Sequence, residues 1–174
     1  MNYSVIKNCD IANGEGVRVT LFVSGCRNHC KECFQPETWD FNYGKTFTVD
    51  TEEEVIKMLA PDYIKGLTIL GGEPFEPENQ VCLMTLLKKV KSIYPNKDIW
   101  CFTGFTLDKE IFGHSRASGL FALEMLKSID TLVDGRFVNE LKDLTLKFRG
   151  SKNQRIIDVQ QTLKNNYLVL SPLN

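Results

Sequence analysis

The chain has 174 residues and a formal net charge of −1, from 21 lysine and arginine and 22 aspartate and glutamate residues. This length fits one domain that folds without disulfide bonds. The balanced charge does not favour a nucleic-acid partner, and the apolar runs are far shorter than the roughly 20 residues of a membrane-spanning helix. No apolar stretch follows a basic start in residues 1–10, so we expect a cytoplasmic protein with no nucleic-acid or membrane partner.

The predicted elements of the first half alternate between strands and helices. Residues 17–23 are rich in β-branched and aromatic side chains and predict a strand that runs into a cysteine-bearing loop. Residues 51–54 have the Thr-x-x-Glu form of a capping box and predict the start of a short helix. Residues 66–70 predict a second strand, and the apolar spacing over residues 83–90 predicts a helix after Pro77.

The same alternation continues in the second half. Residues 99–103 predict a third strand, residues 120–129 a helix, and residues 131–133 a fourth strand that ends at Asp134. Such alternation indicates βαβ units and a parallel sheet, whose ligands gather at the carboxyl ends of the strands. Asp134, at one such end, either accepts a hydrogen bond from a ribose hydroxyl or starts a turn.

The pattern weakens after residue 141. Residues 149–155 are polar and basic, which favours a solvated segment, and residues 167–170 predict a last short strand.

Three cysteines, Cys26, Cys30 and Cys33, share one loop in a C-x3-C-x2-C spacing. A closed zinc site normally has four ligands, and no second cysteine pair is present. Three thiolates suit an iron–sulfur cluster with one iron left open to an exogenous ligand. A zinc-stabilised binding module that adds Cys9 or His29 is the alternative. The scattered cysteines are expected to be small buried hydrophobic residues: Cys9, Cys82 and Cys101.

A second motif, Gly71-Gly72-Glu73-Pro74, follows the second predicted strand. The two glycines allow the backbone to approach a ligand closely, Glu73 offers an acceptor to an ammonium group, and Pro74 stiffens the turn. Together with the cysteine spacing, this segment resembles the radical S-adenosylmethionine superfamily.

The resemblance implies an α/β fold, namely a small radical S-adenosylmethionine domain with an incomplete parallel (β/α) barrel that has an open side. It also implies a [4Fe-4S] cluster held by Cys26, Cys30 and Cys33. The open iron would chelate S-adenosylmethionine, whose reductive cleavage gives methionine and a 5′-deoxyadenosyl radical. The residues expected to contact S-adenosylmethionine are Glu32, Cys33, Phe34, Gly71, Gly72, Glu73 and Pro74.

Within the superfamily, the chain is similar to the glycyl-radical-enzyme activases of anaerobic ribonucleotide reductases. The similarity spans nearly the whole chain and rests on residues 13–18, 21–26, 33–39, 98–100, 103–104, 133–135 and 149–155. It implies one activase domain over residues 1–174, with a core of about residues 14–140 and a carboxyl-terminal tail that contacts the partner.

The partner implied by this similarity is the large catalytic subunit of an anaerobic ribonucleotide reductase, in which one glycine becomes a glycyl radical. An electron donor such as flavodoxin is implied as well. The alternative enzyme is a small radical enzyme that acts on a metabolite, as in deazaguanine-type ring contraction.

Overall fold

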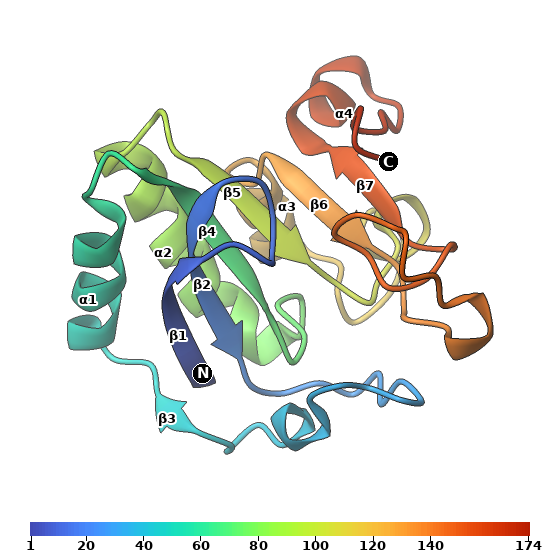
Figure 1. Ribbon diagram of the computed structural model, residues 1–174, viewed down its shortest axis with the longest axis horizontal. Helices are drawn as coiled ribbons and strands as arrows, with labels where there is room; N and C mark the ends of the chain where they lie inside the picture. The colour runs from blue at the N-terminus through green and yellow to red at the C-terminus, as the bar shows by residue number, and fades with distance from the viewer.

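The computed structural model describes residues 1–174 and contains one seven-stranded sheet with the order β3-β1-β2-β4-β5-β6-β7 (Figure 1). The strands are β1 (Asn2–Asp10), β2 (Val17–Val23), β3 (Lys45–Thr46), β4 (Ile64–Gly71), β5 (Asp98–Phe102), β6 (Thr131–Asp134) and β7 (Arg155–Asp158). The α-helices are α1 (Val49–Leu59), α2 (Pro77–Ile93), α3 (Leu120–Leu126) and α4 (Val159–Asn165). None of the helices is both long and apolar enough to span a bilayer.

The centre of the sheet is parallel. Strands β2, β4, β5 and β6 pair in parallel, and α1, α2 and α3 connect them in turn. This confirms the predicted α/β class with an open, largely parallel sheet. The outer strands β1, β3 and β7 pair antiparallel, so the sheet ends in two antiparallel edges that the sequence analysis did not include.

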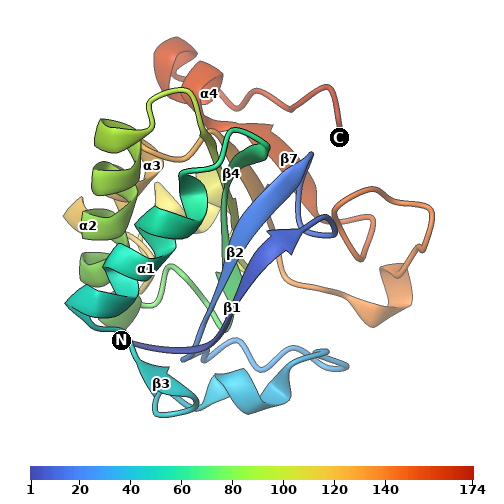
Figure 2. The same cartoon turned by 60° about the vertical axis from the view of Figure 1, so that its left-hand side comes forward.

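The two faces of the sheet differ. Figure 2 shows α1, α2 and α3 on one face, while the segment between β6 and β7 lies beyond the other. Because side chains alternate along a strand, Ile69 joins the main core under the helices, whereas Leu70 lines a cavity at the opposite face. The leucines of α2 that the spacing predicted as core, such as Leu83 and Leu87, are fully buried. Each contributes about 1.5–3 kcal/mol to folding.

Two predicted boundaries are wrong. The N-cap of helix α1 lies three residues before the expected cap, because Thr48 is the N-cap and Thr51 completes the capping box from the third helical position. The last strand is β7 rather than residues 167–170, which contribute a single bridge between Leu170 and Ile157.

Candidate metal centre

The three motif cysteines lie on the loop that leaves the carboxyl end of β2. Cys26 is buried, Cys30 and Cys33 are half-buried, and all three line one cavity of about 490 Å³. None of the three forms a disulfide bond. The cavity also receives the ends of β4, β5 and β6, so it lies at the carboxyl edge of the parallel strands, as expected for this class of sheet.

The loop is held by backbone hydrogen bonds on both sides. The N–H of Gly25 donates to the carbonyl of Thr38 at 2.8 Å, and the N–H of Glu73 donates to the carbonyl of Gly25 at 2.8 Å. His29 and Glu32 have positive φ angles of 46° and 61°, a conformation that costs a non-glycine residue about 1–3 kcal/mol and that clusters at functional sites. The surrounding contacts therefore impose this shape on the loop.

The environment of the thiols disfavours their ionised form when no cation is bound. Burial raises the pKa of Cys26 to about 11, and burial together with the neighbouring Cys33 raises the pKa of Cys30. Because a metal binds the thiolate, metal binding at this cavity must release protons.

The donor set fits a multinuclear cluster. No three His, Cys, Asp or Glu side chains are arranged around a single ion. A [4Fe-4S] cluster does not require such convergence, because each protein thiolate binds a different iron atom. Three thiols that line one cavity of about 490 Å³ would suit a cluster with three irons bound by protein thiolates and a fourth iron without a protein ligand.

Gly71 and Gly72 line the next wall of the cavity with their backbone. A Cβ atom on Gly72 would lie 2.7 Å from the carbonyl oxygen of Gly25 and 3.0 Å from that of Thr38. Gly71 has a φ angle of 111°, in the region that favours glycine. The glycines therefore let the end of β4 approach the cysteine loop itself, in addition to leaving backbone exposed to the cavity.

Glu73 does not line the cavity, and its carboxylate has four donors of its own. Phe75 N–H and the Thr103 hydroxyl donate to Oε1 at 2.9 and 2.7 Å, while Gly104 N–H and the Asn28 amide donate to Oε2 at 2.8 and 3.1 Å. Burial raises the pKa of Glu73 to about 7. In the structure this side chain joins the cysteine loop to the ends of β4 and β5. Its expected role as an acceptor for an ammonium stays a prediction.

The other predicted cofactor contacts divide in the same way. Glu32, Cys33 and Phe34 line the cavity together with the two glycines, whereas Pro74 is buried behind the wall. Five of the seven residues therefore share one cavity and two support it. Contact with a bound cofactor stays a prediction for all seven.

The far wall of the cavity comes from a segment to which the sequence analysis assigned no site residue. Phe137, Phe148 and Arg149 line the cavity, as does Gln154. Gln154 accepts hydrogen bonds from the N–H groups of Gly150 and Ser151 at 2.8 and 3.1 Å and donates to the carbonyl of Gly135 at 3.0 Å. The prediction of a solvated segment at residues 149–155 holds only in part: Gly150, Lys152 and Asn153 are exposed, whereas Ser151 is buried and Arg149 and Gln154 line the cavity. The similarity of residues 149–155 to the activases was the only signal in the sequence that this segment belongs to the site.

Three further expectations are corrected. Asp134 is buried and accepts hydrogen bonds from Leu107 N–H at 2.8 Å and Arg155 Nε at 2.9 Å, so it neither faces a ribose site nor merely starts a turn. Cys101 is buried as expected, but Cys82 is only half-buried and Cys9 is exposed. His29, a ligand only in the zinc alternative, stacks its imidazole on the indole of Trp39 with ring centroids 4.5 Å apart.

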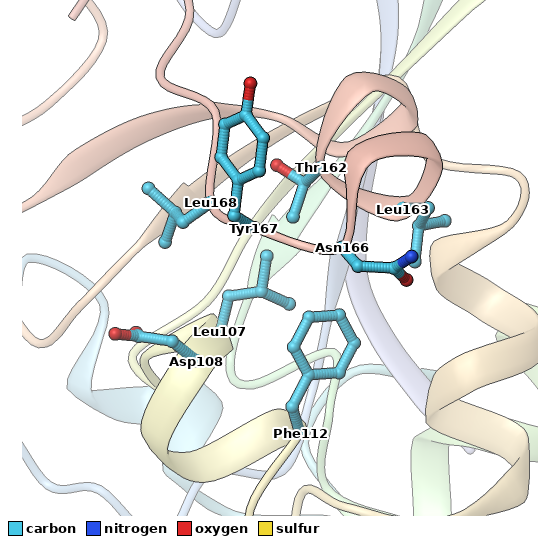
Figure 3. A pocket seen from close by; sticks show the side chains of 8 residues that line it. All are labelled: Leu107, Asp108, Phe112, Thr162, Leu163, Asn166, Tyr167 and Leu168. Carbon is cyan, nitrogen blue, oxygen red and sulfur yellow. The ribbon is translucent and has the colours of Figure 1, made fainter.

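A second cavity, of about 390 Å³, lies between the short π-helix Leu107–Ile111 and the end of α4 (Figure 3). Its lining is mainly apolar, with Phe112, Leu163 and Leu168 prominent and Asp108 as the one carboxylate. It contains none of the predicted site residues.

Comparison with known proteins agrees with the cysteine motif. The 4Fe-4S single cluster domain family matches residues 12–157, which include all three cysteines. The chain is 40% identical over 156 residues to the anaerobic ribonucleoside-triphosphate reductase-activating protein of Enterobacteria phage T4, an alignment that covers 90% of this chain and 93% of the relative.

Cellular relatives give the same result. The activating protein of Haemophilus influenzae is 43% identical over 158 residues, covering 90% of this chain and 97% of the relative. That of Escherichia coli K12 is 39% identical over 156 residues, covering 88% and 96%. With its single-cluster domain and this similarity over nearly its whole length, the chain belongs to the family of anaerobic ribonucleoside-triphosphate reductase-activating proteins.

Proposed function

We propose that the protein activates an anaerobic ribonucleoside-triphosphate reductase by generating a glycyl radical on the large catalytic subunit of that enzyme. The observation that carries the proposal is the cavity that Cys26, Cys30 and Cys33 line together with Gly71 and Gly72. Its support is the membership of the chain in a family whose members are named for activating this reductase.

A [4Fe-4S] cluster would be held by Cys26, Cys30 and Cys33, and it would supply the one-electron reduction that cleaves S-adenosylmethionine to methionine and a 5′-deoxyadenosyl radical. The residues of this chain would hold the cluster, enclose the cavity and shield the radical from water. Cys26, Cys30 and Cys33 supply the three thiolates, and the backbone of Gly71 and Gly72 lies beside them. Apolar side chains that are only partly exposed extend the enclosure and limit the access of water, which protects a reactive radical: Phe102, Phe137 and Phe148.

Glu73 and Pro74 act from behind the wall in this proposal. The carboxylate of Glu73 sets the distance between the cysteine loop and the turn at Thr103 and Gly104 through hydrogen bonds to both. Gly104 lines the cavity. Displacement of this carboxylate would therefore move two walls of the site at once.

The proposed surface for the reductase subunit is the tail that follows residue 140, at the mouth of the cavity. Lys142 and Arg149 line the cavity, and Leu144 nearby is 89% exposed. On the cysteine loop, Phe34 also lines the cavity and is 78% exposed. Large apolar side chains exposed beside basic groups are typical of protein interaction sites.

We also propose a small flavoprotein such as flavodoxin as the electron donor, and the cytoplasm as the location. A flavin of this class delivers single electrons, which is what a [4Fe-4S] centre accepts. Six cysteines in a chain that needs no cross-links suit a reducing compartment.

The test is an electron paramagnetic resonance spectrum of the reductase large subunit after anaerobic incubation with the reconstituted protein, S-adenosylmethionine and reductant. A glycine-centred doublet is expected, and alanine at Cys26, Cys30 or Cys33 should abolish it. Cys82→Ala is the matched control, since Cys82 lies on α2 outside the cavity and should leave the doublet intact. An intact cluster that yields 5′-deoxyadenosine but no glycine signal would refute the proposal.

A further inference from the structure

Glu76 is a fully buried carboxylate that the site described above does not use. It is the N-cap residue of α2, yet its side chain makes no capping hydrogen bond to that helix. The carboxylate instead accepts hydrogen bonds from the backbone N–H of Arg27 at 2.8 Å and from Nη1 of Arg27 at 2.7 Å. Arg27 directly follows the ligand-bearing Cys26, so the carboxylate of Glu76 is directed toward the cysteine loop.

A second arginine closes this contact into a ring. Nε of Arg116 donates to both oxygens of Glu76 at 3.1 and 3.2 Å, and Nη2 of Arg116 donates to the side-chain oxygen of Asn28 at 2.6 Å. The amide of Asn28 donates to Glu73 at 3.1 Å, and the N–H of Glu76 donates to the carbonyl of Glu73 at 3.2 Å. The ring thus includes residues 27 and 28, two of the three residues between Cys26 and Cys30.

Both guanidinium groups are also fixed from one face by an aromatic ring. Arg27 lies over Phe41 at 4.3 Å from the ring centroid, and Arg116 lies over the buried Phe105 at 4.7 Å. Stacking of this kind orients a planar guanidinium while its edge donates hydrogen bonds. The side chains of Arg27 and Arg116 are therefore held in one arrangement around Glu76.

The exposed neighbour Glu78 offers a contrast. It also pairs with Arg27, but about half of each of these two side chains is exposed. An exposed ion pair contributes little, whereas hydrogen bonds to a desolvated carboxylate are short and strong. Of the two acids, only Glu76 reaches the backbone of the cysteine loop.

We propose that Glu76 and Arg116 are positioning residues, which hold residues 27–28 so that Cys26 and Cys30 keep the spacing required by the metal centre. The proposal rests on the assignment of these cysteines as ligands. Neither Glu76 nor Arg116 lines the cavity, so both act through the loop. Arg27 and Arg116 keep partial exposure to solvent, so a neutral residue at position 76 strands no buried cation, and the variant chain should fold.

The first experiment compares amide hydrogen exchange in full-length Glu76→Gln and Glu78→Gln without metal. In Glu76→Gln, the amides of residues 27–30 should exchange about tenfold faster, because a charge-assisted anchor of the loop is lost while β4 and β5 keep their contacts. Glu78→Gln should match the wild-type chain. A purely global structural role would instead raise exchange across the whole sheet.

The second experiment measures the rate at which anaerobically reconstituted protein loses iron to a chelator. Glu76→Gln should lose iron roughly five- to tenfold faster than wild type, with Glu78→Gln unchanged. Arg116→Lys keeps the charge but cannot bridge Glu76 and Asn28 together, and it should show the same direction of change. Position 116 lies in a surface loop, so this variant keeps the test available if Glu76→Gln fails to fold.

The outcomes separate the two proposals. If wild type holds its cluster and Glu76→Gln and Arg116→Lys behave like Glu78→Gln in both measurements, the positioning role is refuted and the proposed function stands. Exchange that rises uniformly in Glu76→Gln refutes the positioning role as well. If the wild-type chain binds no cluster, the proposed function fails, and with it the ligand assignment on which this inference depends.

Discussion

Arg18 on β2 pairs with Asp98 on β5 across the intervening strand β4, with Nη1 2.7 Å from the carboxylate. The guanidinium is fully buried, and on its way it donates to the hydroxyl of Thr68 at 2.7 Å and to the carbonyl of Leu67 at 2.9 Å, both on β4. One side chain therefore joins three neighbouring strands of the parallel core, near the amino ends of β2 and β5.

Removal of the acid partner should destabilise the fold without altering the metal centre. In Asp98→Ala the buried guanidinium of Arg18 loses its counter-ion, and we expect a loss of about 2–4 kcal/mol in the free energy of unfolding. Urea denaturation measures this loss. The iron content of the folded variant should equal that of wild type. Lys88→Ala, which breaks the more exposed pair Lys88–Glu124, is the comparison. If Asp98→Ala lost less unfolding free energy than Lys88→Ala, the buried role of Arg18 would be contradicted.

Glu73→Gln should disturb the site more than its small change in shape suggests. The carboxylate of Glu73 accepts two hydrogen bonds at each of its oxygens. The NH₂ group of a glutamine, which is itself a donor, would therefore face donors at whichever position it takes. We expect a cost of about 2–3 kcal/mol and a reduced yield of bound iron. Thermal unfolding and iron analysis check both effects. Thr103→Val, which removes one of the donors, should cost about 1 kcal/mol, and a glutamine variant no worse than this would refute the argument.

A methyl group at position 72 should separate the end of β4 from the cysteine loop. The added Cβ of Gly72→Ala would meet two backbone carbonyl oxygens, those of Gly25 and Thr38, at 2.7 and 3.0 Å. Backbone cannot move aside as a flexible side chain can, so we expect the variant to lose about 1–3 kcal/mol and part of its iron. Gly119→Ala is the control, because no atom lies within 4 Å of its Cβ, although its positive φ adds some strain. Equal iron content in the two variants would argue against a steric role of Gly72.

Acid should remove a small contribution from the Asp108–Arg155 pair. A hydrogen bond from Arg155 lowers the pKa of Asp108 below its ordinary value of 3.8. A carboxyl whose pKa is lower in the folded state stabilises the fold above the unfolded-state pKa, and this contribution disappears as the pH falls through the folded-state pKa. Because the side chain of Asp108 is 43% exposed, we expect Asp108→Asn to cost less than about 1 kcal/mol at pH 7. The difference from wild type in urea denaturation should shrink as the pH falls below 3.8 and vanish once Asp108 is protonated in both states. A constant difference would show that charge is not its cause.

Local patterns in the sequence predicted the elements that depend on near neighbours. The spacing of Leu83, Leu86 and Leu87 predicted the buried face of α2, and the strands that end at Gly71 and Asp134 followed from short apolar runs before turn residues. The exact start of α1 was missed, because two threonines three residues apart can each begin a capping box. Which of them does so depends on where the preceding chain leaves β3.

The cysteine spacing and the glycine pair at positions 71 and 72 indicated an iron–sulfur cluster through their resemblance to a known family, and they predicted the edge of the sheet where these residues lie, because ligand type and strand direction are local properties. Only the tertiary structure decided what the acids beside it do. Glu73 reaches Thr103 thirty positions away, and Glu76 reaches Arg116 forty positions away. Such contacts depend on the order of the strands and on the path of the loops, and no periodicity within a short window encodes either.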